Sequence, residues 1–303
     1  MIVQVVDQKR GAGIGASTAA AALGCHPFLS RIGLWLQLTG HNVTRRTGSE
    51  AEWGTLLEPV VRGYYAARHG YTGEHKRIVV PTESIYHPDM PWLRCTPDGI
   101  CEEDYPDGLG DGSFATKLVQ VKCPTIYTSW HWGHPAARSV PPHYRIQAVV
   151  EMAITGLPRV DFAVLCGGFD YFEVSVEHDA ELEEVTLDHL RQFWRLVETR
   201  TEPDIDGDDD WRAYFADRLP RERFEIVADP SVEALMNAWR DAEIGLRTAQ
   251  GDLDAVKNRI LKVAVENRAT HIKTDHGRVS VQVSKAGNAF VRAPKEWAID
   301  KED

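Results

Sequence analysis

Residues 94–124 constrain the fold of this chain most, because they combine two short apolar runs with a polar, glycine-containing loop between them. Such a pattern is typical of a β-hairpin. The first run ends in Pro97 and Asp98, and the second carries Gln120 and Lys122. Side chains two residues apart on a strand leave the same face, so we expect Gln120 and Lys122 to point together. The hairpin partner would then bring Asp98 beside them.

A carboxylate, an amide oxygen and an ammonium group gathered at one point suit a divalent metal ion and a water that attacks phosphorus. The same residues also fit an ordinary hairpin with a Pro-Asp turn and a solvated Lys122. The motif alone does not decide between these interpretations, and the choice depends on the rest of the chain.

The composition is that of a soluble globular protein, with 303 residues of which 43% are hydrophobic and 26% charged. The sequence has no apolar run as long as a membrane span and no signal-peptide pattern at its N-terminus, so we expect a cytoplasmic protein without a membrane partner. Its five cysteines are scattered, with no C-x-x-C pair. This favours reduced thiols over a disulfide or zinc framework.

The net charge of −11 argues against a general coat of nonspecific DNA binding. The charge is uneven, however. Acidic residues gather in residues 177–184 and 204–210, whereas the first eighty residues carry many of the basic groups. This distribution is compatible with a basic groove on an acidic body.

A glycine-rich turn precedes an alanine-rich helix in residues 10–24. Ser17 is a suitable N-cap for that helix and Gly24 a suitable end. The free N–H groups at such a helix start can hold a phosphate. The composition alone favours the simpler interpretation, a buried alanine helix.

Helices are also predicted over residues 30–39 and 52–69. The second of them contains Glu58 among apolar neighbours, where a carboxylate is unfavourable unless it is paired or bound to a metal. The alternative is that Glu58 lies on the solvated face. Strands are predicted near residues 77–80, 93–96 and 118–122.

An amphipathic helix follows Pro142 and ends at Gly156, with Tyr144 and Gln147 on one face. A second hairpin over residues 160–176 and a helix over 180–198 complete an α/β pattern with a mixed central sheet. Beyond them, apolar residues over 235–263 alternate by four and three, as in a coiled coil. That stripe fits packing against the protein body as well as self-association. A short hairpin surrounds Gly277.

Five segments in the same order resemble the YqaJ-type viral recombinase exonucleases, the family of lambda exonuclease within the PD-(D/E)XK nuclease superfamily. They are R-x-x-x-I-G-A-S at 10–17, G-T-L-L-E-P at 54–59, C-T-P-D-G at 95–99, V-x-V-K-C-P at 119–124 and Y-x-x-Q at 144–147. The resemblance covers about residues 8–200, and five ordered motifs outweigh any single one.

The resemblance implies an α/β, restriction-endonuclease-like core with a mixed central sheet flanked by helices, and a C-terminal helical extension with a short hairpin. We place the nuclease core at residues 1–200, an acidic linker or helical segment at 201–230, and the extension with a long helix and a β-hairpin at 231–303. The resemblance further implies a phage or prophage enzyme in a bacterial host, which digests linear double-stranded DNA from a 5′ end. The remaining 3′ strand would pass to a single-strand annealing protein. Family relatives form toroidal trimers, which implies a homo-oligomer.

By matching position, Glu58, Asp98 and Gln120 would hold two divalent ions, Mg²⁺ or Mn²⁺. All-oxygen ligands select such hard ions over zinc. The resemblance assigns Lys122 to the attacking water and Gln147 to support from the adjacent helix.

The resemblance also implies an end-recognition site. Arg10 and Ser17 match residues that grip the terminal 5′-phosphate, with Thr96 assisting. Tyr144 would support the catalytic site. An arginine that holds a terminal phosphate in a bidentate contact would distinguish an exonuclease from an internal cutter.

This chain departs from the family pattern at Gln120, where the family usually has Glu. The amide removes one negative charge from a site for dications, so we expect weaker metal binding and an inactivated or weakened enzyme. Gln120 is either a natural variant or a deliberate Glu→Gln change that traps a DNA complex, and the family context favours the deliberate change. We expect Gln120→Glu to raise Mg²⁺-dependent digestion strongly; equal rates would show Gln120 to be a competent native ligand.

Other functions remain open. The same fold could serve a structure-specific endonuclease or resolvase, which would cut closed circular DNA. A DNA-end-binding protein without catalysis is also consistent with Gln120. An iron–sulfur nuclease of the CRISPR-adaptation type is excluded, because no cysteine cluster follows Cys166.

Overall fold

The structure is a computed structural model that describes residues 13–41, 49–104, 112–216, 218–220, 222, 228–274 and 277–292. The chain forms two compact units, Met1–Leu219 and Pro220–Asp303. The predicted site residues all belong to the first unit.

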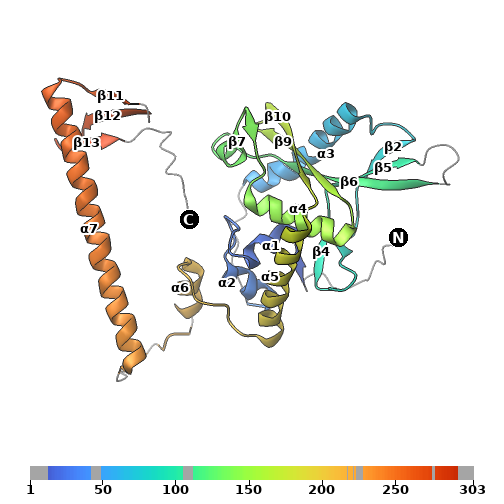
Figure 1. The fold of residues 1–303 in the computed structure, drawn as a ribbon, viewed down its shortest axis with the longest axis horizontal. Coiled ribbons are helices and arrows are strands. Elements are labelled where there is room, and N and C mark those ends of the chain that lie inside the picture. Colours follow the sequence, from blue (N-terminus) through green and yellow to red (C-terminus); the bar gives the residue numbers. More distant parts are fainter. Residues whose placement is uncertain are drawn as a thin grey trace. The chain divides into compact units, whose positions relative to one another are not determined.

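A five-stranded mixed sheet organises the first unit (Figure 1), with the strand order β10-β9-β6-β5-β2. The pair β6 and β9 is parallel, and the other neighbours are antiparallel. The strands are β2 (Lys76–Val79), β5 (Gly99–Asp104), β6 (Ser113–Lys122), β9 (Arg159–Cys166) and β10 (Asp170–Glu177). The predicted mixed sheet is therefore confirmed.

Helices cover both faces of this sheet. On one face, α3 (Ser49–His69) packs Val61 and Tyr65 against a cluster that includes Val119 and Val121 of β6. On the other face, α4 (Pro142–Thr155) packs Ala148 and Met152 against Leu118 of β6 and Phe162 of β9. Because side chains alternate along a strand, residues 118, 120 and 122 of β6 face α4.

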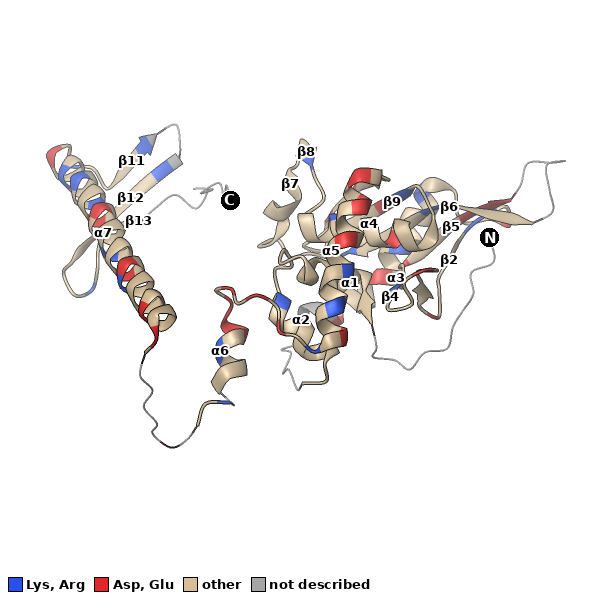
Figure 2. Cartoon of the chain, turned by 60° about the horizontal axis from the view of Figure 1, so that its bottom comes forward, with Lys and Arg blue, Asp and Glu red and all other residues tan. Residues whose placement is uncertain are grey.

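Further helices pack around α4 and build the largest apolar cluster. They are α1 (Ala16–Ala22), α2 (Arg31–Leu38), α5 (Ala180–Thr199) and α6 (Asp209–Ala216). The segment predicted as an acidic linker contributes to this cluster, because Trp211 and Tyr214 of α6 are buried in it. Acidic residues gather in the segment that leads into α6 (Figure 2).

A hairpin is present, but its first strand differs from the one that the sequence predicts. The run before Asp98 contains β4 (Leu93–Cys95), which pairs with β1 (Ile14–Gly15) and β3 (Ile85–Tyr86) in a separate sheet. The hairpin consists of β5 and β6. Pro97 lacks an N–H for a strand ladder, so it separates the two strands. A Cβ on Gly99 would lie 2.5 Å from Ile78 Cγ2, so glycine permits the tight entry into β5.

Ser17 is not the N-cap of the first helix, contrary to the prediction. Gly15 is the N-cap, in an extended conformation and without a side-chain cap hydrogen bond. The chain runs directly from β1 into α1, because Gly15 still pairs with Arg94 of β4. Ser17 therefore lies within the first turn of α1.

A short insertion follows β6 and leads to α4. It holds a 3₁₀ helix (Ser129–Trp132) and a small hairpin of β7 (Gly133–His134) and β8 (Ala137–Arg138). Trp132 is buried against Phe162 and Tyr144, which fixes the insertion to the sheet.

The second unit consists of a long helix and a small sheet. The elements are α7 (Pro230–Glu266), β11 (His271–Thr274), β12 (Gly277–Val283) and β13 (Ala289–Arg292). They confirm the predicted C-terminal helix and hairpin. Apolar residues of the stripe on α7, such as Leu235, Trp239 and Leu246, are exposed, and both signs of charge are distributed along the helix (Figure 2). Within the described residues, the helices lack the length and apolar character required to cross a membrane.

Candidate functional site

Asp98 lies where the chain passes from the small sheet into β5, directly beside β6. Its Oδ2 accepts a hydrogen bond of 2.7 Å from the backbone N–H of Val121. Its backbone carbonyl accepts a bond of 3.0 Å from Arg62 Nη1 of α3. The carboxylate is therefore held at a defined position next to the strand that carries Gln120 and Lys122.

Gln120 and Lys122 point together, as the strand periodicity predicts. Lys122 Nζ donates to Gln120 Oε1 at 3.1 Å and lies 4.8 Å from the centroid of the Tyr144 ring. The ammonium is thus fixed between an amide oxygen and an aromatic face, which is a favourable position for a cation. Lys122 is half-buried, whereas Gln120 is almost completely buried.

Two residues of α4 complete the surroundings of Gln120. Gln147 Nε2 donates to Gln120 Oε1 at 3.1 Å and to Glu151 Oε1 at 2.9 Å. Gln120 Nε2 donates to Glu151 Oε1 at 2.9 Å. Glu151 is 1% exposed, and its Oε2 has no hydrogen-bond partner among the residues that the structure describes. Such an unsatisfied buried oxygen is uncommon and requires an explanation.

Glu58 approaches the site from α3. Its Oε1 accepts a bond of 2.6 Å from Arg62 Nη1, the same nitrogen that donates to the Asp98 carbonyl. The Glu58 side chain is 34% exposed, so a carboxylate oxygen is accessible to an ion from solution. Glu58 is therefore paired and partly exposed, which combines the two interpretations that its sequence neighbours allow.

Burial controls the charges of this cluster. Burial raises the pKa of the Asp98 carboxyl above its usual range, and Glu58 raises it further, while Lys122 and the Val121 N–H act in the opposite direction. Burial also raises the pKa of the Glu151 carboxyl to about 7, against the effects of Gln147 and Lys122. The site thus contains carboxylates whose ionised forms lack sufficient positive charge nearby.

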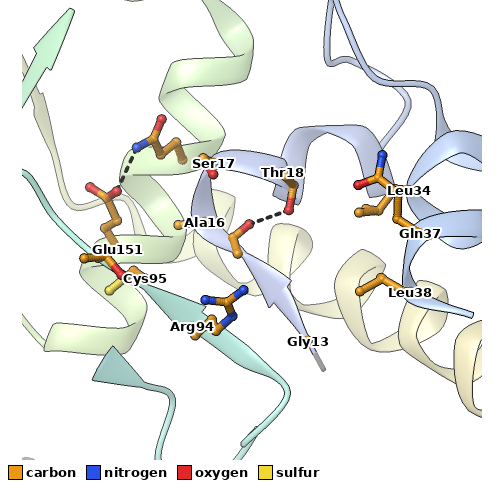
Figure 3. Close-up of a pocket in the computed structure, with 13 residues that line it drawn as sticks. Gly13, Ala16, Ser17, Thr18, Leu34, Gln37, Leu38, Arg94, Cys95 and Glu151 are labelled. Atoms are coloured by element: carbon orange, nitrogen blue, oxygen red, sulfur yellow. Dashed lines mark hydrogen bonds between the residues drawn. The ribbon is translucent and has the colours of Figure 1, made fainter. Parts of the chain in front are cut away.

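A cavity of about 320 Å³ opens beside these residues (Figure 3). It brings together the start of α1, the end of β4 and the inner face of α4. The lining residues are Gly13, Gly15, Ala16, Ser17, Thr18, Leu34, Gln37, Leu38, Arg94, Cys95, Thr96, Gln147 and Glu151. The predicted phosphate-binding residues Ser17 and Thr96 therefore share one cavity with a guanidinium group, that of Arg94.

The structure brings most of the predicted site residues together. Gln120, Lys122, Gln147 and Tyr144 are linked by direct contacts. Asp98 is bonded to the backbone of Val121 between Gln120 and Lys122, and Arg62 joins Glu58 to Asp98. Ser17 and Thr96 line the adjacent cavity. Arg10 lies outside the described residues.

The sequence interpretation missed three residues of this site. One is Arg62, which follows Glu58 by four residues on the same helix, a spacing that favours an ion pair. Another is Arg94, which directly precedes the C-T-P-D-G segment. A cation two residues from Thr96, a predicted phosphate-binding residue, is a usable signal. Glu151 follows Gln147 by four residues on the same helix, so the two share a face. That spacing could have identified Glu151.

Two carboxylates and one amide offer oxygen donors that fit Mg²⁺ or Mn²⁺. The Asp98 carboxylate is buried near Glu58, and a dication would relieve that arrangement. These three ligands, however, carry one negative charge fewer than the family pattern, because Gln120 replaces a glutamate. Within the described residues, no three histidine, cysteine or acidic side chains are gathered as a metal site. The donor chemistry therefore fits a divalent ion, with an amide where a carboxylate would be expected.

The fold is similar to that of known nuclease structures. The alkaline exonuclease LHK-Exo from Laribacter hongkongensis aligns with a TM-score of 0.50 and 22% identity, over 70% of this chain and 96% of that chain. LHK-Exo in complex with dAMP aligns with a TM-score of 0.50 and 23% identity, over the same shares. These likenesses confirm the predicted fold class.

Sequence comparison identifies the family. The uncharacterized protein YqaJ of Bacillus subtilis (strain 168) is 25% identical over 214 residues, which cover 69% of this chain and 61% of the relative. This chain thus matches less than two thirds of the length of that relative. A family model for the YqaJ-like viral recombinase domain matches residues 7–158, about half of the chain. The chain belongs to the YqaJ-like viral recombinase family, as its five ordered motifs predict.

Proposed function

We propose that this protein is a metal-dependent exonuclease that digests linear double-stranded DNA in the 5′-to-3′ direction and leaves 3′ single strands for phage-type recombination. One observation carries the proposal: Asp98, Gln120 and Lys122 converge beside the end of β6, with Glu58 joined to them through Arg62. The family and the exonuclease-like fold support it.

The proposed roles follow from the chemistry of each group. Asp98, Glu58 and the Gln120 carbonyl would hold one or two ions of Mg²⁺ or Mn²⁺. When bound, such ions neutralise the charge that develops on phosphate oxygens and lower the pKa of a bound water. Lys122 is fixed by Gln120 and the Tyr144 ring, so its ammonium can orient the attacking water. Gln147 holds the amide of Gln120 in place.

End recognition would take place in the adjacent cavity. Ser17 and Thr96 offer hydroxyl groups and Arg94 a guanidinium, which together suit a terminal 5′-phosphate. By family resemblance, Arg10 would add a second guanidinium. The same resemblance supports a ring-shaped homo-trimer and a single-strand annealing protein as partners.

The proposal is tested with three DNA substrates in Mg²⁺: linear duplex with 5′-phosphate, linear duplex with 5′-hydroxyl, and closed circular duplex. We expect rapid release of nucleotides from the 5′-phosphorylated strand, slower release from the 5′-hydroxyl end and no cleavage of the circle. Ser17→Ala should reduce the preference for the phosphorylated end.

Two outcomes would contradict the proposal in different ways. Cleavage of the closed circle would identify an endonuclease on the same fold. Tight binding to DNA ends without cleavage, at every Mg²⁺ and Mn²⁺ concentration, would identify an end-binding protein.

A further inference from the structure

Gln120 and Glu151 form a buried pair with a fixed polarity. The Lys122 ammonium can only donate hydrogen bonds, and an ionised carboxylate can only accept them. Gln120 lies between them, with its oxygen toward Lys122 at 3.1 Å and its nitrogen toward Glu151 at 2.9 Å. The amide satisfies both neighbours in one orientation only, and that orientation presents its oxygen on the side of Lys122.

A carboxylate at residue 120 would not fit this arrangement. Two carboxylates would then face each other across about 3 Å in a buried site, where both cannot be ionised at once. The opposite exchange would fit equally well, because a glutamine at residue 151 could donate to a glutamate at residue 120. Residues 120 and 151 are thus complementary, and one of them carries the negative charge.

We propose that Glu151 carries the negative charge that the site lacks at residue 120, and that it acts through the Gln120 amide, so that the two residues form an exchangeable amide–carboxylate pair. Glu151 is then a positioning residue. Its carboxylate fixes Gln120 and Gln147 and polarises the Gln120 amide, which increases the negative charge on Gln120 Oε1. That oxygen accepts from Lys122 and Gln147 in this structure, so a metal ion would take the place of one of these donors.

The contact between Gln120 and Glu151 helps to decide whether Gln120 is a natural variant or a deliberate Glu→Gln change. A site that simply lost a carboxylate would keep only hydrogen-bond donors around residue 120. Lys122 and Gln147 are such donors, but Glu151 accepts from Gln120 Nε2, and a carboxylate at residue 120 has no N–H to donate. This favours a natural variant over a deliberate change. It also replaces the expectation that Gln120→Glu alone strongly raises activity, because that variant would have two carboxylates in contact.

The proposal rests on the proposed metal-dependent function, but its test does not require DNA cleavage. We would prepare the full-length protein, Gln120→Glu, Glu151→Gln and the double exchange, then measure thermal unfolding in EDTA and Mn²⁺ binding by calorimetry. Glu151→Gln should weaken Mn²⁺ binding by about 10- to 100-fold, as for other residues that support metal ligands. Gln120→Glu should unfold at a lower temperature. The double exchange should restore the Mn²⁺ affinity to within a few-fold of that of the original protein. It should also return the unfolding temperature to near the original value.

The test is whether the effects of the two single substitutions on Mn²⁺ affinity are non-additive in the double exchange. If the double exchange shows only the product of the two single effects on Mn²⁺ affinity, the pair is not coupled and the proposal is wrong. A wild-type protein that binds no Mn²⁺ would also overturn it. If the Gln120→Glu variant does not fold, recovery of folding in the double exchange would itself support the proposal. A restored pair in a protein that cleaves no DNA would refute only the nuclease proposal.

Discussion

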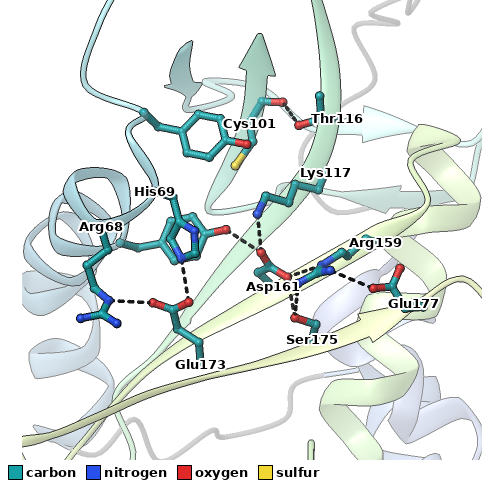
Figure 4. Close-up of polar contacts among 12 residues, drawn as sticks. Arg68, His69, Cys101, Thr116, Lys117, Arg159, Asp161, Glu173, Ser175 and Glu177 are labelled. Carbon is teal, nitrogen blue, oxygen red and sulfur yellow. Dashed lines mark hydrogen bonds and ion pairs between the residues drawn. The ribbon is translucent and has the colours of Figure 1, made fainter.

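Two buried carboxylates of this protein, Asp161 and Glu151, have opposite surroundings. Asp161 of β9 accepts bonds from Tyr65 and Lys117 on one oxygen and from Arg159 and Ser175 on the other, at 2.6–2.7 Å (Figure 4). Although burial acts to raise the pKa of Asp161, these hydrogen bonds outweigh it and hold the pKa well below its usual range.

Glu151 is equally buried, yet its hydrogen-bond donors are the neutral amides of Gln120 and Gln147. One of its oxygens has no partner among the described residues, and burial raises its pKa to about 7. A cluster that stabilises the fold satisfies its charges internally, as that of Asp161 does. The Glu151 cluster leaves charge unsatisfied, which is expected where a ligand completes the site.

Lys122 and Lys117 provide the sharpest test of this comparison, because both lie on β6 and both donate to a buried side-chain oxygen. We expect Lys122→Met to lower the rate of DNA digestion by about 10²- to 10³-fold, the usual cost of removing one positioned donor at a reacting centre. Its unfolding temperature should change little. Digestion of labelled linear duplex and thermal unfolding, measured on the same preparations, check both expectations.

Lys117→Met is the matched control. It should lower the unfolding temperature, because Asp161 loses one of its two cationic partners, while the digestion rate per folded molecule stays near that of the original protein. Equal losses of digestion in the two variants would show that the two clusters are not functionally distinct.

Asp161→Asn should have the largest effect on stability. Its carboxylate side chain is 3% exposed and pairs with Lys117 and Arg159. The neutral amide removes the carboxylate to which Lys117 donates and leaves Arg159 paired with the exposed Glu177. Breaking a buried ion pair typically destabilises a protein by about 3–5 kcal/mol. Urea unfolding at pH 7 measures the loss. Glu177→Gln is the control, because Glu177 also pairs with Arg159 but is exposed, and it should change little.

The pH dependence of stability gives a smaller and more specific effect. Because the pKa of Asp161 is lower in the folded state, its ionised form stabilises the protein above the unfolded pKa of about 4. That contribution is lost as the pH falls from about 4 toward the folded pKa. Asp161→Asn should therefore flatten the acid side of the stability profile, and its stability should approach that of the original protein near pH 2. If stability falls with decreasing pH in the same way in both proteins, groups other than Asp161 cause the loss of stability in acid.

The sequence predicts those parts of the site that depend on local periodicity. Gln120 and Lys122 share a face because strand side chains alternate, and this holds whichever strand lies beside them. The sequence also predicts Asp98 beside them, but through the run that precedes it, and that run is β4 of the small sheet. The structure brings it there because Pro97 and Gly99 direct the chain from the small sheet into β5.

Hydrogen-bond partners that are distant in the sequence are not determined by local patterns, so they could not be predicted from the sequence. Asp161 interrupts an apolar strand, which indicates that it needs partners without identifying Tyr65 or Lys117. Glu151 is recognisable from its spacing to Gln147, but its contact with Gln120 depends on how α4 packs on the sheet. The complementarity of residues 120 and 151 is therefore visible only in three dimensions.

The smallest expected effect is that of Glu151→Gln on metal-free stability, and it contrasts directly with Asp161→Asn. Both substitutions replace a buried carboxylate with an amide. At residue 151 the new amide can still accept from Gln120 and Gln147, and the unfavourable burial of a charge is removed. Urea unfolding in EDTA at pH 7 should therefore change by less than about 1 kcal/mol, or show a gain. A loss as large as that of Asp161→Asn would mean that Glu151 stabilises the fold in the same way, and the contrast between the two carboxylates would no longer separate structure from function.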